Sequence, residues 1–387
     1  MQLTAKTKGA CIVLALLAIG GIAAWIYQLN GGLAVTGMSN VTSWGLYITM
    51  FMFFVGLSAG GLIVASSAHV FNIEAFKKIS LPAVILSTVC ICLAGMFILI
   101  DLGGIQRIWR IITGANFASP LVWDMCIILV YLVINILDIV WMRRGAESKV
   151  RKLSYVALPV AILVHSVTAW IFGLEAAKEG WNSAIMAPIF VASALDSGLA
   201  LLIVALMGLK KAKIMEVEDG LFGKLGKLLA TFVAVDAFLI LCEVLTMGYS
   251  GGDTAQAILR EMTAGATAPY FWFEIVCGLL VPFILLASAK LREKRGVLLF
   301  AAILVVLGVF CKRAWLLFSS FIPVNVAGGP GVTLGTTAAA TGTAQDVFAL
   351  AGCYAPTGIE IAIVCGVIAL GALAFVLMSQ KLLKKAE

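Results

Sequence analysis

Charged residues are scarce in this chain, and their scarcity excludes the ordinary soluble classes of protein. Only 12% of the 387 residues are Asp, Glu, Lys or Arg, whereas 62% are apolar. Soluble domains are roughly a quarter charged and about half apolar. The chain instead contains apolar runs of about 20 residues, which is the length that a helix needs to cross a bilayer.

Patterns for binding metal or haem are also missing. Nine cysteines occur without a CxxC pair, and the chain has 2 histidines. Most of the cysteines stand inside apolar runs, where they act as small helix residues, so we expect no metal site in this chain. We predict His69 and His165 at different depths in the membrane, which argues against a haem held between them.

The apolar runs predict an all-α, polytopic membrane protein. Lipid offers the backbone no hydrogen-bond partners, so only helices and closed barrels span it. The alternating strands of about ten residues that are typical of a barrel are absent. We therefore predict ten transmembrane helices, near residues 9–29, 43–71, 81–102, 120–142, 152–176, 186–209, 225–248, 269–290, 296–320 and 356–379.

Basic residues concentrate in every second loop. Lys6 and Lys8 precede the first span, Lys210 and Lys211 follow the sixth, and Lys385 lies in the basic tail. Cytoplasmic loops carry this excess of Lys and Arg, so we predict a protein of the bacterial cytoplasmic membrane with both termini in the cytoplasm. These loops account for the net charge of +7, and a nucleic-acid partner is not expected.

Two segments of the chain look like copies of one unit. The helix end Ile98-Leu99-Ile100-Asp101 matches Ile240-Leu241-Cys242-Glu243, and the helix start Pro120-Leu121-Val122-Trp123 matches Pro269-Tyr270-Phe271-Trp272. Both pairs run in the same direction, which predicts two parallel four-helix-bundle repeats with flanking helices; chance similarity of apolar segments is the alternative. The predicted parts are an N-terminal helix (1–30), a first bundle (41–176), a second bundle (186–320), an outer loop (321–355) and a C-terminal helix with a basic tail (356–387).

Ionisable residues inside predicted spans are candidates for function, because each acid at the bilayer centre costs about 3 kcal/mol by insertion scales. Such acids either bond neighbouring helices together or line a hydrated track for protons, and both alternatives stay open for any one of them. The predicted proton path comprises Asp124, Asp138, Asp196, Asp236, Glu243, Glu274, Arg313 and Glu360.

Several motifs, taken in order, resemble the NrfD/PsrC-like family of polysulfide reductase-type membrane subunits. They are Trp44-Gly45-Leu46-Tyr47 followed by Phe53 to Gly61, Asp101-Leu102-Gly103 with Arg107, Ser119-Pro120 with Trp123, and His165 to Trp170. The similarity covers nearly all of the chain. One departure is Gly103-Gly104-Ile105, where the family often has a proline.

The resemblance implies a haem-free membrane anchor of a respiratory oxidoreductase complex. Such a subunit exchanges electrons and protons with menaquinone or ubiquinone near the outer face. It passes the electrons to or from a four-cluster, ferredoxin-like iron–sulfur subunit, often joined to a molybdopterin catalytic subunit. The iron–sulfur clusters and the molybdopterin belong to those partners, while this chain contacts the quinone and the membrane lipid.

The resemblance also points to a quinone site between the second, third, fourth and fifth predicted helices. We expect Asp101 and His165 to be catalytic, and the quinone to contact Trp44, Tyr47, Gly60, Arg107 and Trp123. Aromatic walls and small residues would leave room for a flat ring. Two other functions stay open, a secondary transporter and a passive anchor without quinone chemistry.

Overall fold

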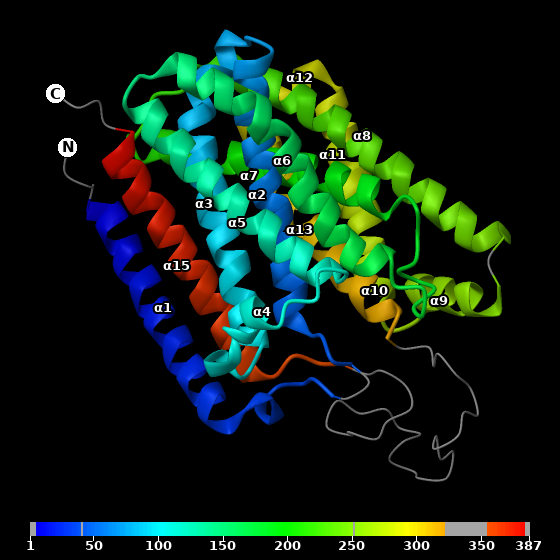
Figure 1. The fold of residues 1–387 in the computed structure, drawn as a ribbon. Coiled ribbons are helices and arrows are strands. Elements are labelled where there is room, and N and C mark those ends of the chain that lie inside the picture. Colours follow the sequence, from blue (N-terminus) through cyan, green and yellow to red (C-terminus); the bar gives the residue numbers. More distant parts are fainter. Residues whose placement is uncertain (1–4, 40–41, 251, 322–353, 384–387) are drawn as a thin grey trace, which may run out of the picture.

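The computed structural model describes residues 5–39, 42–250, 252–321 and 354–383, and these ranges contain helices and no strands (Figure 1). Ten of the helices are long and apolar enough to cross a membrane, as predicted. The spanning helices are α1 (Ala5–Gly31), α2 (Leu46–Val70), α3 (Glu74–Asp101), α5 (Pro120–Arg143), α6 (Glu147–Gly173), α7 (Met186–Lys211), α8 (Asp219–Ser250), α10–η3–α11 (Ala268–Trp272, Phe273–Leu280, Val281–Ala287), α13 (Arg295–Ser319) and α15 (Gly358–Leu382).

Short helices connect several of these spans. They are η1 (Leu33–Val35), η2 (Ile105–Arg107), α4 (Arg110–Thr113), α9 (Asp253–Ala264) and α12 (Ala289–Arg292). Helix α3 begins at Glu74, earlier than the predicted residue 81. The reason is that its first turn is polar and is stabilised by an ion pair of 2.6 Å between Lys77 and Glu74, which hydropathy alone does not detect.

Helix α2 lies at the centre of the molecule. It packs against α3, α6, α7 and α13, and nearly all of its apolar stretch is buried. Small residues of α2 such as Gly56, Gly60 and Gly61 allow neighbouring helices to approach it closely, which suits it to the central position. The predicted first and second bundles meet along α2, while their descent from a repeat stays a prediction.

Close packing of α2 on α7 depends on glycine. A Cβ on Gly60 would lie 2.1 Å from the carbonyl oxygen of Ala194 and 2.8 Å from the Cα of Gly198. Small residues allow helix backbones in membranes to approach in this way. Gly60 therefore serves a helix contact, and it leaves no open space for the quinone ring that we expected beside it.

Helices α1 and α15 form a pair on one flank of the molecule, in blue and red in Figure 1. The pair packs mainly on α3, and most of α1 is exposed along its length. We call the end of the molecule at which α3 ends and α2 begins the Asp101 end, and the opposite end the Lys210 end. In Figure 1 the Asp101 end carries α4 and the Lys210 end carries α12.

Candidate functional site

Asp101 is the last residue of α3 and is half-buried. Its Oδ1 atom is buried and has no hydrogen-bond partner within the described ranges. The chain then turns sharply at Gly103, whose φ of +62° favours glycine. A Cβ on Gly103 would also lie 2.8 Å from the Leu33 side chain. The turn thus places an unpartnered carboxylate oxygen at the point where α3 and η1 approach each other.

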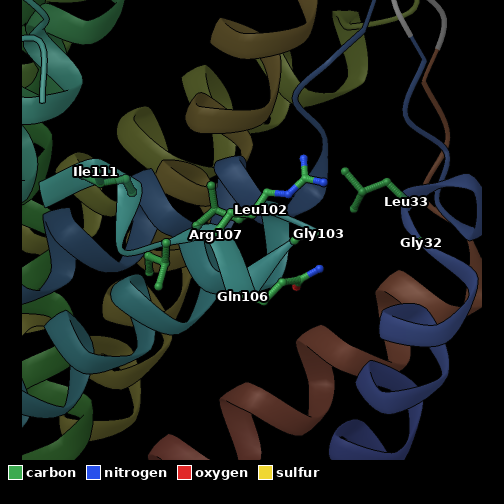
Figure 2. A pocket seen from close by; sticks show the side chains of 9 residues that line it. Gly32, Leu33, Leu102, Gly103, Gln106, Arg107 and Ile111 are labelled. Carbon is green, nitrogen blue, oxygen red and sulfur yellow. The ribbon is translucent and has the colours of Figure 1, made fainter. Parts of the chain in front are cut away.

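A pocket of about 540 Å³ opens beside this turn. Figure 2 shows Leu33 on one side of it and Arg107 and Gln106 on the other, with both polar side chains extending toward the side of Leu33. The residues that line the pocket are Gly32, Leu33, Leu102, Gly103, Gly104, Gln106, Arg107, Ile108 and Ile111. The pocket therefore lies between η1 and the α3–η2–α4 segment, instead of among the four helices predicted.

A chain of hydrogen bonds links α2 to the end of α3. The buried Tyr47 hydroxyl donates to Oε1 of Gln28 at 2.5 Å, and Nε2 of Gln28 donates to the carbonyl oxygen of Ile100 at 3.1 Å. Gln28 belongs to α1 and is itself buried. Sequence reasoning missed Gln28, whose only signal is that it is a polar residue near the end of an apolar span.

Glu360 holds the start of α15 against the start of α2. Its Oε2 accepts from the backbone N–H groups of Gly37 and Thr357, both at 2.8 Å, and its Oε1 accepts from the Tyr354 hydroxyl at 2.6 Å. The Tyr354 oxygen accepts in turn from the backbone N–H of Leu46. Burial, and then the Glu360 carboxylate, raises the pKa of Tyr354, so the phenol keeps the proton that it donates.

Other residues expected at the quinone lie away from the pocket. Trp44 stacks on Trp181, with ring centroids 6.0 Å apart, and meets the edge of Phe172. Trp123 is 39% exposed, and its indole N–H donates to the carbonyl oxygen of Phe117. Neither Trp44 nor Trp123 lines the pocket. The structure thus places Trp44, Tyr47, Asp101, Arg107 and Trp123 at one end of the molecule, and of these five Arg107 lines the pocket.

His165 lies deeper and contacts a buried arginine. Its Nε2 atom is 3.1 Å from Nη2 of Arg313, and both side chains lie against Gly56 of α2. Gly56 is nine residues beyond Tyr47, which corresponds to about 13 Å along a helix. A single head group at the Asp101 end does not bridge that distance, so the structure separates the two residues that we expected to act together.

The buried charges of the second bundle gather around Lys312, which with Asp236, Glu274 and Trp315 forms what we call the Lys312 cluster. Lys312 Nζ lies 2.7 and 2.8 Å from the Asp236 carboxylate oxygens and 3.4 Å from Oε1 of Glu274. The Trp315 indole N–H donates to Oε2 of Glu274 at 2.5 Å. Asp196 is fully buried nearby. These residues come from four helices; Lys312 and Asp236 pair directly, whereas neither carboxylate oxygen of Asp196 has a hydrogen-bond partner in the described residues.

The remaining residues of the expected proton path are spread through both bundles. The Thr168 hydroxyl donates to Oδ1 of Asp124 at 2.6 Å, and the Ser183 hydroxyl donates to Oε2 of Glu243 at 2.7 Å. Asp138 is buried, and neither of its carboxylate oxygens has a hydrogen-bond partner in the described part of the chain. Glu360 stands apart with α15, and the path is not a continuous row.

Comparison with known proteins places this sequence in a family. The family model described as "Polysulphide reductase, NrfD" matches residues 34–325. A protein of Halobacterium salinarum, provisionally named as a membrane subunit of dimethyl sulfoxide reductase, is 37% identical over 95% of this chain and 89% of its own length.

Two further relatives are more distant. A selenate reductase subunit of Mesobacillus selenatarsenatis is 28% identical over 81% of this chain and 82% of its own length. The Hdr-like menaquinol oxidoreductase integral membrane subunit of Archaeoglobus fulgidus is 28% identical over 79% of this chain and 78% of its own length. These relatives are membrane subunits of oxidoreductase complexes, which supports the same anchoring role here. The chain belongs to the NrfD/polysulphide reductase family.

Proposed function

We propose that this chain is the haem-free membrane subunit of a respiratory oxidoreductase complex and exchanges electrons and protons with menaquinone or ubiquinone at the pocket beside Asp101. The observation that carries this proposal is the half-buried Asp101 carboxylate, which has an oxygen lacking any partner in the described residues and directly precedes Leu102 and Gly103, two residues that line a pocket of about 540 Å³. The name of the Archaeoglobus fulgidus relative, a menaquinol oxidoreductase subunit, supports the choice of ligand.

The residues of the pocket suit quinol chemistry. Oxidation of a quinol to a quinone releases two protons and two electrons, and a positioned carboxylate can accept a proton from a ring hydroxyl. We assign that role to Asp101. Arg107 belongs to the same segment as Asp101 and extends toward Leu33 on the other side of the pocket, and its guanidinium can stabilise negative charge on a ring oxygen as the proton leaves. Reduction of a quinone runs through the same steps in reverse.

The electrons leave through partner subunits. We propose that a four-cluster, ferredoxin-like iron–sulfur subunit docks at the Asp101 end, which is the outer end by the distribution of basic residues. The described loops at 30–39 and 103–119 border the pocket and are the nearest surfaces for such a partner. Relatives named as dimethyl sulfoxide and selenate reductase subunits support a molybdopterin enzyme as the next partner.

We further propose that the second bundle carries protons. Glu243 and Trp315 line a cavity of about 20 Å³, which is room for roughly one water molecule. Trp315 bonds Glu274, and Glu274 lies beside Lys312 and Asp236. This succession of groups leads from the Asp101 end toward the middle of the membrane, as a proton relay requires.

The proposal for the pocket is tested by Asp101→Asn in the purified complex. The amide keeps the size of the side chain but cannot take a proton, so we expect quinol-linked turnover to fall by about 100-fold or more. Electron delivery from reduced viologen straight to the partner enzyme should stay unchanged, because that route bypasses the membrane subunit.

Asp253→Asn is the matched control, because Asp253 is an exposed acid at the start of α9. It should leave both activities at the wild-type level. Wild-type quinol turnover in Asp101→Asn would show that the subunit is a passive anchor or that its quinone chemistry is elsewhere.

A further inference from the structure

The pocket wall that follows α1 begins before the segment matched by the family model. The family model begins at residue 34, whereas Gln28, Gly32 and Leu33 all precede it. Gly32 and Leu33 line the pocket directly. The two residues that line this side of the candidate site, and the helix α1 that leads into them, therefore lie outside the family segment.

Gln28 ties this wall to the opposite one. It is buried near the end of α1, and its side-chain amide bonds two different helices. The amide N–H side faces the Ile100 carbonyl, since an oxygen there would oppose another oxygen. The amide oxygen must then face Tyr47, whose hydroxyl donates to it. Gln28 thus fixes the distance between α1 and the last turn of α3, where Asp101 stands.

Two further contacts hold α1 and η1 in place from the other side. The Thr357 hydroxyl at the start of α15 donates to the carbonyl oxygen of Val35 at 3.1 Å, and the Glu360 carboxylate accepts from the Gly37 N–H at 2.8 Å. Helix α15 also packs along α1. The connection between α1 and α2 is therefore anchored at both ends, and Leu33 is held close to Gly103.

We propose that the α1–α15 pair supports the η1 wall of the quinone pocket and that Gln28 is the positioning residue that sets the width of this pocket. The inference rests on the proposed function of the Asp101 pocket. It identifies the ligand further as a ring held between an apolar wall, Leu33, and a polar wall, Gln106 and Arg107.

The test is Gln28→Leu in the intact complex. Leucine has nearly the same side-chain volume as glutamine but makes neither hydrogen bond. The KM for menaquinol should therefore rise about tenfold, while kcat changes little. Inhibition by a quinol analogue such as a quinoline N-oxide should weaken by a similar factor. Viologen-linked activity and assembly should match the wild type.

A double-mutant cycle separates positioning from general loss of packing. Because Tyr47 and Gln28 share one bond, Tyr47→Phe and Gln28→Leu should not be additive in their effect on KM. Asn30→Leu is the matched control, since Asn30 is also an α1 amide, and among the described residues its side chain bonds the carbonyl oxygen of Ile26 in its own helix. It should leave KM unchanged.

The outcomes distinguish this inference from the proposal on which it rests. If Asp101→Asn keeps quinol turnover, the assignment of the pocket itself fails. If Asp101→Asn loses turnover while Gln28→Leu keeps the wild-type KM and the wild-type response to the inhibitor, the pocket stands and the positioning role of Gln28 is wrong. Additive effects of Gln28→Leu and Tyr47→Phe would also overturn that role.

Discussion

The Asp101 pocket and the Lys312 cluster differ in whether a buried charge has a partner. At the pocket, the half-buried Asp101 carboxylate has an oxygen without a hydrogen-bond partner in the described chain, and the next residue, Leu102, lines the pocket. In the Lys312 cluster, the Lys312 and Asp236 side chains are completely buried and directly paired. A buried ion that is fully compensated needs no ligand, whereas an uncompensated one beside a pocket is available to bind one.

This difference separates two roles that the sequence had combined. All of these acids stand in or at the ends of apolar spans, so the sequence alone did not distinguish functional acids from structural ones. The structure shows that some of them serve mainly other protein groups, as Glu360 does for α15. Mutations should therefore affect stability in one region and quinone chemistry in the other.

The largest effect that we expect is on stability, in Lys312→Met. Removing the lysine leaves Asp236 and Glu274 buried without their cation, which typically costs about 3–5 kcal/mol. The thermal unfolding midpoint of the purified complex in detergent should drop sharply. Lys312→Met combined with Asp236→Asn should recover part of the loss, because one of the unpaired charges is then gone. An unchanged unfolding midpoint in Lys312→Met would show that the Lys312 cluster does not stabilise the fold, and the proposed difference from the Asp101 pocket would be wrong.

A moderate effect is expected where the two bundles meet. Gly60→Ala places a Cβ against the Ala194 carbonyl oxygen, and overpacking of this kind costs about 1–3 kcal/mol. Gly95→Ala in α3 is the matched control, because a Cβ there meets nothing within 4 Å. A lowered midpoint for Gly60→Ala, with no loss for Gly95→Ala, would show that the contact of α2 with α7 joins the two regions.

The smallest effect is expected for Glu243→Gln. The glutamine oxygen can still accept from the Ser183 hydroxyl, so the unfolding midpoint should not change. If the second bundle conducts protons, the number of protons moved per quinol should fall in proteoliposomes that report internal pH, while quinol turnover continues. Unchanged proton movement would mean that Glu243 is a structural residue. The second bundle would then contribute stability alone, and the Asp101 pocket would carry the quinone chemistry.

The number and approximate position of the spans could be predicted from sequence, because lipid forces backbone hydrogen bonds into helices. The predicted helix ends were less accurate, since α3 begins at Glu74 with a polar turn that precedes the apolar run. Helix α9 was not predicted, because it is short and half polar. The predicted loop 321–355 lies almost entirely outside the described residues.

The candidate site was predicted only in part. Asp101 and Arg107 stand at one turn, so local sequence was enough to place them together. Gln28 and its partner Ile100 are 72 residues apart, and no local pattern reports such a contact. The partners of His165 and Trp44 were missed for the same reason, because they depend on how α6, α7 and α13 pack around α2.

The wide π-helical turns of η3 (Phe273–Leu280) bear on how the two halves should be aligned. Asp124 comes directly after the Pro120–Trp123 motif, whereas Phe273 separates Glu274 from the matching motif that ends at Trp272. One added residue rotates an α-helix by about 100°, but a π turn closes over an extra residue. The segment η3 can therefore absorb Phe273 as an insertion, so that the residues that follow it, from Val281 onward, return to the helical face of their counterparts in the first half. An ungapped alignment of the two halves would miss that correspondence.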